Sequence, residues 1–423
     1  MKFKNPGMRL GIVCLAAASA GLSLVIISIS KVLLVIAVLP ALLSGKRPVV
    51  DGLQLQKMWA PLLATVIVFA FATSLLWTVA PMDLALGALG KYGKFLVIPA
   101  LLVLIRTRQE ACYALACFLG AQAFLLMSSW LLYFHVPLVW ATSNMALSHY
   151  AVFSSYLDQG VMSAVVAAIF WHLKTLAPNK PLFYVATLIA LLALANVFIV
   201  FVGRTGQVVG LAMVSLAIFW AVPRRYRIAT LLVPPLLFLL AVFSFDKVAQ
   251  RLTFTKTEIS QYSAGVGAAT STDNRLDFWR GSVEAILEKP FAGSGLGGWT
   301  SAYNRIQKLK YPTHKDLKAG GNPHQEFLLW GVQLGIGGIV LLMTFLSAVM
   351  LDLRKMDMPI ARAGQSVLVA LVISNLFNSS LYDAYIGDFF CLSLGVLLAY
   401  GARSRYESQG QPQESRTMNV KMG

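Results

Sequence analysis

Three basic residues have the types and settings that chemistry on a phosphorylated substrate needs. Arg204 stands between two apolar runs, Arg275 begins a stretch with helical spacing, and His324 precedes another apolar run. A guanidinium presents five N–H donors in one plane and binds phosphate oxygens in pairs. A neutral imidazole can take a proton from a hydroxyl group. The residue types therefore predict an anion-binding pair of arginines and a histidine base.

Arg204 lies in a Gly-Arg-Thr-Gly sequence between the apolar runs 181–203 and 205–223. The turn between two such runs is short, so Arg204 must lie at or below a membrane surface, where an ionisable residue is a functional candidate. Gly203 and Gly206 leave backbone space beside the guanidinium. We expect it to bind a phosphate or diphosphate; the alternative is an arginine that extends to lipid phosphates.

Arg275 falls in the first turn of an expected helix. A cation there opposes the helix dipole, so helix stability does not explain it. Asp273 and Asp277 allow the alternative of an ordinary solvated arginine. Arg280 is a weaker candidate of the same kind.

His324 is the candidate catalytic base. Asn322 predicts a helix N-cap, Pro323 suits the first helical position, and Gln325 completes a pattern like a capping box. The positive end of that helix would disfavour imidazolium and keep the ring neutral. The alternative is an interfacial histidine that bonds a carbonyl group. The remaining histidines show no spacing typical of a metal site: His135, His149, His172 and His314.

Two further pairs of charged residues fall in segments predicted to lie outside the membrane. Lys91 and Lys94 are three residues apart, so they share a helix face and could hold an anion or extend to the lipid surface. Asp383 and Asp388 lie among aromatic residues in the last outside turn. They could orient a histidine or a sugar hydroxyl, or be plain polar loop residues.

The composition identifies what must position these residues. Of 423 residues, 57% are apolar and only 13% are charged, about half the usual charged share of a soluble domain. Lys and Arg outnumber Asp and Glu by 35 to 18, for a net charge of +17. Proteins that bind nucleic acid are rich in charge, and this chain is poor in it, so no nucleic acid partner is expected. The composition favours an all-α integral membrane protein.

Twelve membrane spans are predicted from apolar runs near the required length of roughly 20 residues. The runs are 10–30, 32–45, 58–80, 91–105, 111–134, 159–173, 181–203, 205–223, 228–245, 327–351, 363–382 and 384–402. With an inside N-terminus, the inside segments hold 20 Lys and Arg, and the short outside segments hold 3. This bias predicts that both termini are cytoplasmic.

The expected organisation is a bundle over 1–245, a large outside loop over 246–326, further spans over 327–402 and a cytoplasmic tail over 403–423, disordered from Glu407. Within the loop, helical spacing predicts one helix from Thr272 to Pro290 and another over 299–309, and 255–271 is expected to be mobile. Gly293, Gly295 and Gly298 spell a dinucleotide motif, but no strand precedes them, so a flexible turn is the better interpretation. The cysteines all lie in apolar spans, which indicates neither disulfides nor a cysteine metal site: Cys14, Cys112, Cys117 and Cys391.

These features together resemble the O-antigen ligase and polymerase superfamily of the bacterial inner membrane. The resemblance is carried by Gly203-Arg204-Thr205-Gly206, by Asp273-Asn274-Arg275 opening a long outside loop, by the turn Gly293–Gly298 and by Asn322-Pro323-His324-Gln325-Glu326-Phe327-Leu328. The chain departs from the family pattern in having Gly203 before the arginine and Gln325 after the histidine. Within the superfamily, lipopolysaccharide O-antigen ligases are the most similar.

The resemblance implies a fold like that of GT-C membrane glycosyltransferases, without a metal or other cofactor. It implies transfer of a preassembled glycan from undecaprenyl diphosphate to lipid A–core on the periplasmic face. By position, Arg204 and Arg275 match the family arginines that hold the diphosphate, and His324 matches the family base. We expect these residues to surround one outward-facing cavity. The oligomeric state is open, with a monomer favoured.

Other functions fit the same sequence. A polysaccharide polymerase or a protein O-oligosaccharyltransferase of the superfamily would use the same donor with another acceptor. A transporter would also have many spans and a few buried charges, but transporters often show repeated halves. Here the candidate residues gather on one side, which favours an enzyme.

Overall fold

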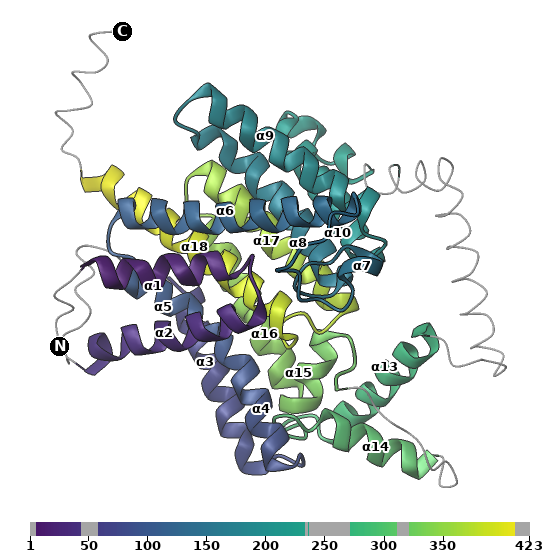
Figure 1. Ribbon diagram of the computed structural model, residues 1–423. Coiled ribbons are helices and arrows are strands. Elements are labelled where there is room, and N and C mark those ends of the chain that lie inside the picture. Colours follow the sequence, from purple (N-terminus) through teal and green to yellow (C-terminus); the bar gives the residue numbers. More distant parts are fainter. Residues whose placement is uncertain (1–5, 44–57, 233–235, 237–270, 311–320, 411–423) are drawn as a thin grey trace.

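The computed structural model describes residues 6–43, 58–232, 236, 271–310 and 321–410. The regular structure of these residues is helical throughout (Figure 1). In chain order the α-helices are α1 (Pro6–Ser19), α2 (Leu24–Leu43), α3 (Ala60–Thr73), α4 (Met82–Tyr92), α5 (Val97–Leu104), α6 (Arg108–Tyr133), α7 (Ala146–His149), α8 (Tyr156–Leu173), α9 (Lys180–Ala195), α10 (Arg204–Ala221), α13 (Ser271–Glu288), α14 (Trp299–Lys310), α15 (Glu326–Leu334), α16 (Ile336–Leu353), α17 (Met358–Phe377) and α18 (Ala384–Gly410).

The helices make a multi-pass membrane protein. In the part of the chain that the structure describes, eight helical segments are long and apolar enough to cross a membrane, and α1 and α2 add shorter apolar helices. The centre of the bundle is α8, whose residues 159–170 are all buried. Most of the predicted span 228–245 lies outside the described residues, so the total of twelve spans stays a prediction.

The helix ends meet in two groups at opposite ends of the bundle. At one end, which we call the closed end, Arg9 of α1 bonds Glu110 of α6 at 2.9 Å, and Arg403 of α18 donates to the carbonyl oxygen of Ile105 at 2.5 Å. At the other, the site end, the Tyr385 hydroxyl at the start of α18 donates to the Leu22 carbonyl oxygen between α1 and α2, at 2.7 Å. Successive long helices therefore run in alternating directions, as the loop charges predict.

The first predicted hairpin is confirmed, but its turn was placed wrongly. The chain turns at residues 20–23, between α1 and α2, and Lys31 lies inside α2. The Lys31 ammonium forms an ion pair with Asp388 of α18, at 2.7 Å. A partner within the bundle therefore explains Lys31, which the break between the apolar runs 10–30 and 32–45 had predicted to lie in a turn.

The placement of Lys91 and Lys94 in an outside segment was also wrong. Both lie within one continuous helical segment, Met82–Leu104, which combines α4, the short 3₁₀ turn Gly93–Leu96 and α5. Lys94 is 1% exposed. Sequence periodicity missed the first half of this helix because its first turns alternate small and polar residues with apolar ones.

The predicted span 327–351 is broken into α15 and α16 at Gly335. This glycine has φ +69°, and a side chain there would lie 2.3 Å from the Pro290 carbonyl oxygen. The freed backbone is bonded elsewhere, because the Ile336 N–H donates to the same Pro290 oxygen at 2.7 Å. The break lets α15 turn its N-terminus toward the residues of the candidate site.

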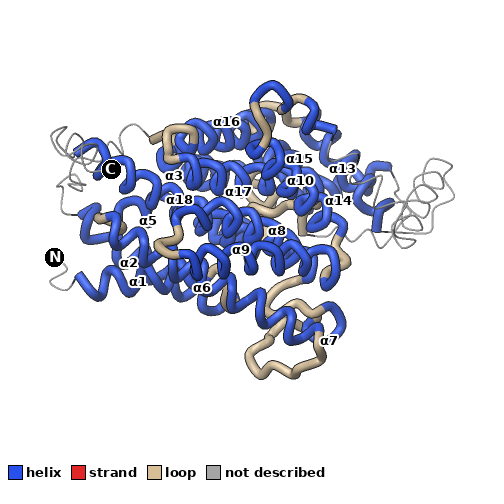
Figure 2. The backbone as a smooth tube through the Cα atoms, turned by 90° about the horizontal axis from the view of Figure 1, so that it is seen from above, coloured by secondary structure: helices blue, strands red, loops and turns tan. Residues whose placement is uncertain are grey.

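The two helices predicted in the outside loop are confirmed as α13 and α14. They pack with α15 around a second, smaller core that includes Ile286, Trp299, Tyr303 and Leu329. The Trp299 indole donates to the Ser282 hydroxyl at 2.8 Å. Figure 1 shows α13 and α14 beside α15, away from α1 and α2, and Figure 2 shows the loop that carries α7 projecting from the bundle.

The tail prediction was partly wrong, since α18 continues as helix through residues 407–410. The segments 255–270 and 411–423, for which mobility and disorder were predicted, lie outside the described residues.

Candidate active site

Arg204 is the first residue of α10, and Gly203 is its N-cap. An added side chain at 203 would lie 3.2 Å from a Leu157 methyl group of α8, and one at 206 would lie 2.9 Å from the Gly160 backbone. The expectation that these glycines leave room for a ligand is therefore corrected: they let α8 and α10 approach closely, as small residues do between membrane helices. The close contact also explains why glycine precedes the arginine here.

The turn before Arg204 is fixed from the side by a buried amide. The last turn of α9 widens into a π-helix, Asn196–Val200, a form that is frequent at functional sites. The Asn196 side chain accepts a hydrogen bond from Ser163 at 3.1 Å and donates one to Ser129 at 3.2 Å. These bonds tie the turn to α6 and α8, so they restrict where the Arg204 backbone can lie.

Arg275 shares one face of α13 with two aromatic residues that contact the His324 segment. Phe278 and Trp279 follow it at spacings of three and four, which places all three on one side of the helix. The Trp279 indole donates to the Pro323 carbonyl oxygen at 3.1 Å. The centres of the Phe278 and His324 rings are 6.4 Å apart. This face of α13 therefore places Arg275 beside His324.

The capping pattern around His324 differs from the prediction. Helix α15 begins at Glu326, and its N-cap is Gln325, whose side chain accepts a hydrogen bond from the Leu328 N–H at 2.5 Å. Asn322 instead accepts one from the His324 N–H, at 2.8 Å. His324 has φ +53°, a left-handed conformation that non-glycine residues rarely adopt outside sites that enforce it. The histidine thus lies just before the helix rather than in its first turn.

The His324 segment is bonded to the last outside turn at two points. The Asn322 amide donates to the Asp383 carboxylate at 3.3 Å. The buried Glu326 carboxylate accepts hydrogen bonds from the N–H groups of Leu381 at 2.9 Å and Tyr382 at 3.2 Å. Asp383 therefore positions the histidine through Asn322 rather than touching it.

Electrostatic effects link Arg204 with Arg275, and Arg275 with His324. Burial lowers the pKa of Arg275, the charge of Arg204 lowers it further, and Tyr156 opposes both. Burial also lowers the pKa of His324 below its usual 6.5, and Arg275 adds to that shift. Two cations beside each other favour an anionic ligand, and a histidine with a lowered pKa is neutral at pH 7 and able to accept a proton.

Lys91 and Lys94 border this group through the turn that carries Asp383. The Lys91 ammonium lies 4.0 Å from the centre of the Tyr382 ring. Lys94 donates to the Asp383 carbonyl oxygen at 2.5 Å. Burial raises the pKa of Asp383, and both lysines oppose that shift. Lys94 thus stabilises the turn through its bond to the Asp383 oxygen, whereas Lys91 remains a candidate for binding an anion.

Two predicted residues are placed away from the three. The Asp388 carboxylate is 1% exposed and pairs with Lys31 inside the bundle. Arg280 is exposed on α13. It lies five residues after Arg275, about 140° around the helix from it.

Tyr156 and Glu326 belong to the site region and escaped sequence reasoning. Tyr156 opens α8 and lies near Arg275. The sequence feature that could have located Tyr156 at a helix start is the N-cap Ser155. The Ser155 side chain accepts a hydrogen bond from the Asp158 N–H at 3.1 Å. Glu326 is 0% exposed. The sequence feature that could have located it is a carboxylate at the start of an apolar run.

A comparison with protein families identifies the central segment. Residues 189–343 match the family model described as O-antigen ligase. The match covers less than half of the chain, so it shows that this central segment is similar to O-antigen ligases. The resemblance seen in the sequence is thereby confirmed for this segment at the level of the superfamily, whose members are enzymes of the ligase or polymerase type. No curated protein matches the chain.

The O-antigen ligase match separates the candidate residues into two groups. Arg204, Arg275 and His324 all lie within 189–343. The matched segment ends before the turn that carries Asp383 and begins after the lysines of α4 and its 3₁₀ turn. The two arginines and the candidate histidine base are therefore all within the matched segment. Their lining of one shared cavity stays a prediction.

Proposed function

We propose that this protein transfers a preassembled O-antigen glycan from undecaprenyl diphosphate to a sugar hydroxyl of lipid A–core. The observations that support the proposal are the contacts of Phe278 and Trp279 on α13 with the His324 segment, which place Arg275 beside His324, and the effect of the Arg204 charge on Arg275. Two arginines suit a diphosphate, and a neutral histidine suits a hydroxyl nucleophile.

In the proposed reaction, Arg204 and Arg275 bind the diphosphate oxygens and stabilise the charge that grows on the leaving group. His324 takes the proton of the acceptor hydroxyl as its oxygen attacks the anomeric carbon. The bond from that carbon to the diphosphate oxygen breaks, and attack from the opposite side inverts the configuration. The products are the new glycosidic bond, undecaprenyl diphosphate and a protonated His324. The two guanidinium groups supply the positive charge without a metal ion.

The proposal includes the setting of the reaction. The protein would lie in the bacterial inner membrane with twelve spans, a GT-C-like fold and both termini in the cytoplasm, and the site end would face the periplasm. Both substrates carry lipid tails, which supports a site at the membrane surface. Lys91 could add a third cation for the diphosphate.

The direct test is glycan transfer by the purified protein in proteoliposomes that contain the lipid-linked donor and lipid A–core. The expected result is a glycosylated lipid A–core with wild type and none above background with His324→Ala. Normal transfer by the variant would exclude His324 as the base. A chromosomal deletion separates ligase from polymerase: bare lipid A–core with accumulated long lipid-linked glycan indicates the ligase, and single-repeat chains indicate the polymerase.

A further inference from the structure

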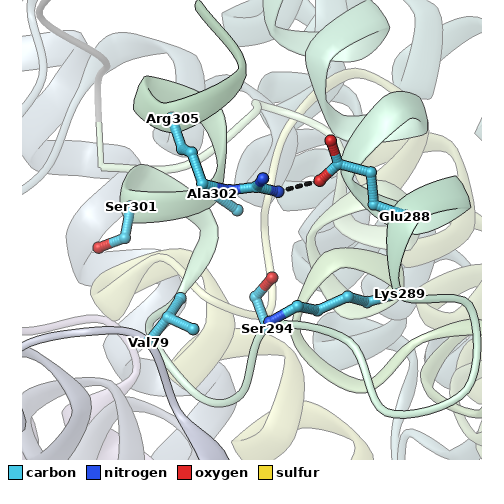
Figure 3. Close-up of a pocket in the computed structure, with 7 residues that line it drawn as sticks. All are labelled: Val79, Glu288, Lys289, Ser294, Ser301, Ala302 and Arg305. Atoms are coloured by element: carbon cyan, nitrogen blue, oxygen red, sulfur yellow. Dashed lines mark hydrogen bonds and ion pairs between the residues drawn. The ribbon is translucent and has the colours of Figure 1, made fainter. Parts of the chain in front are cut away.

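A pocket of about 690 Å³ lies at the site end, apart from the three residues discussed above. Its polar lining comes from the end of α13 with Glu288 and Lys289, from the turn before α14 with Ser294, and from α14 with Ser301 and Arg305 (Figure 3). The volume falls in the range of about 300–1,000 Å³ that is typical of ligand pockets.

The walls of this pocket are held by hydrogen bonds to α15 and to the loop between α3 and α4. The Ser294 N–H donates to the Val332 carbonyl oxygen at 2.7 Å, and the Val79 N–H donates to the Ser294 oxygen at 3.0 Å. The Thr78 hydroxyl donates to the Leu296 oxygen at 2.6 Å. The turn was predicted to be flexible, and these bonds show that it is fixed. The pocket is thus formed before a ligand binds.

The glycines of this turn serve the same purpose. Gly293 and Gly295 have positive φ, and a side chain at 295 would lie 2.3 Å from the Thr78 backbone. The spacing that imitates a dinucleotide motif is therefore needed for close packing of the turn against the loop between α3 and α4.

The polar side chains of the lining suit a ligand rich in hydroxyl groups. Arg305 reaches across the pocket and forms an ion pair with Glu288 (Figure 3). That pairing offsets much of the Arg305 charge, so a compact anion gains less from it than it would from an isolated cation. The serine hydroxyls, the carboxylate and the Lys289 ammonium offer both donors and acceptors. A sugar chain, which also carries both, matches this lining.

The position of the pocket suits sugar units of a bound glycan that are remote from the reacting bond. Glu288 follows Arg275 by 13 residues on the same helix, a rise of about 20 Å. A ligand that reacts near Arg275 and also reaches this pocket must be extended. An oligosaccharide of several sugar units has that length.

We propose that this pocket is an oligosaccharide subsite that binds sugar units distant from the reacting one. The proposal rests on the proposed function for the origin of the sugar chain. The bound sugar units belong either to the donor glycan or to the acceptor core, and both present hydroxyl groups.

The test measures binding without turnover, in the His324→Ala protein in nanodiscs. The probes are a lipid-free oligosaccharide of O-antigen repeat units without core sugars and the lipid-free core oligosaccharide without O-antigen. Ser301→Trp fills the pocket and Arg305→Ala removes its central ion pair. Each should weaken binding of one probe at least fivefold. The probe that is affected identifies the source of the sugar chain.

The matched control is Lys310→Ala. Lys310 and Glu284 form an ion pair at 2.6 Å that joins the same two helices outside the pocket. This variant should bind both probes as the parent protein does. Unchanged binding of both probes by Ser301→Trp and Arg305→Ala would overturn the subsite, as would an equal loss in Lys310→Ala. Transfer by the wild type is scored separately, so failure of the proposed function is distinguishable from failure of the subsite.

Discussion

The closed end and the site end of the bundle use arginine in opposite ways. At the closed end, Arg9 pairs with Glu110, and Arg403 donates to backbone carbonyl oxygens. At the site end, the charged group with the largest effect on the pKa of Arg275 is another cation, Arg204. The arginines of the closed end hold helices together, whereas the repulsion between Arg204 and Arg275 would be reduced by a bound anion.

The difference extends to the backbone. The closed end joins regular helix ends, and its buried Asp352 accepts N–H groups from Trp59 and Ala60 at the start of α3, each at 2.8 Å. The site end contains the π-helix Asn196–Val200, and His324 there has a positive φ. Irregular backbone is costly, and it persists where surrounding contacts enforce it, as they do around functional groups.

The largest expected effect is on the chemical step at the site end. His324→Ala should lower kcat by about 10²–10⁴ because the acceptor hydroxyl loses its base. His135→Ala is the matched control, since His135 also has a positive φ, +61°. Initial rates of transfer in proteoliposomes measure both. Similar losses in the two variants would show that backbone strain, not base chemistry, is being disturbed.

Arg275→Gln should lower kcat/KM for the lipid-linked donor by about 10–100-fold, from the loss of charged hydrogen bonds to phosphate. Arg280→Gln, on another side of the same helix, should change it little. Donor titrations with both variants measure the difference. Equal effects would indicate that α13 contributes only general positive charge.

The same variant sharpens the role of His324 through pH. The rate should be lost as pH falls through the lowered pKa of His324, because the protonated ring cannot act as a base. Since Arg275 disfavours the imidazolium ion, removing it should raise this pKa and move the acid limb to higher pH. A pH profile of kcat/KM measures the limb. An unchanged limb in Arg275→Gln would mean that the titrating group is not beside Arg275.

A smaller effect is expected from the Asn322–Asp383 bond, because it acts on His324 indirectly. Asn322→Asp places two carboxylates together and should lower kcat about tenfold, the equivalent of one lost buried hydrogen bond. Asp383→Asn added to it restores a donor and an acceptor, and should recover most of the rate. Single-turnover rates of the single and double variants test this. Failure of the double variant to recover would remove Asp383 as a positioning residue.

The smallest effect on transfer is expected at the closed end. Glu110→Gln leaves the largely buried Arg9 without its charged partner and should lower the free energy of unfolding by about 3 kcal/mol. Because the pair lies at the other end of the bundle, kcat per folded molecule should not change. Thermal unfolding in detergent and transfer rates measure the two quantities. A large fall in kcat of Glu110→Gln would contradict the assignment of a purely structural role to the closed end.

The sequence predicted the features that depend on local pattern. Apolar runs located most membrane helices, and helical spacing located α13 and α14. Arg204 stood out because ionisable groups between apolar runs are rare, whereas Arg275 and His324 stood out by their positions at expected helix starts. These signals are carried by neighbours in the chain, so they survive without knowledge of the fold.

What the sequence missed depends on contacts between distant segments. Lys31 was assigned to a turn because its partner, Asp388, lies far along the chain. Gly335 was passed over because a single glycine in an apolar run does not reveal the Pro290 oxygen that fills the space beside it. The role of Glu326 needed the turn at Leu381, which only tertiary packing brings to it.

The central claim is that Arg204 and Arg275 together hold the donor diphosphate beside His324. It is tested most directly by the affinity of the His324→Ala protein for undecaprenyl diphosphate in nanodiscs, with and without Arg204→Ala and Arg275→Ala. We expect the two arginine substitutions to raise Kd at least tenfold. A Kd that is the same with and without both arginines would contradict the claim.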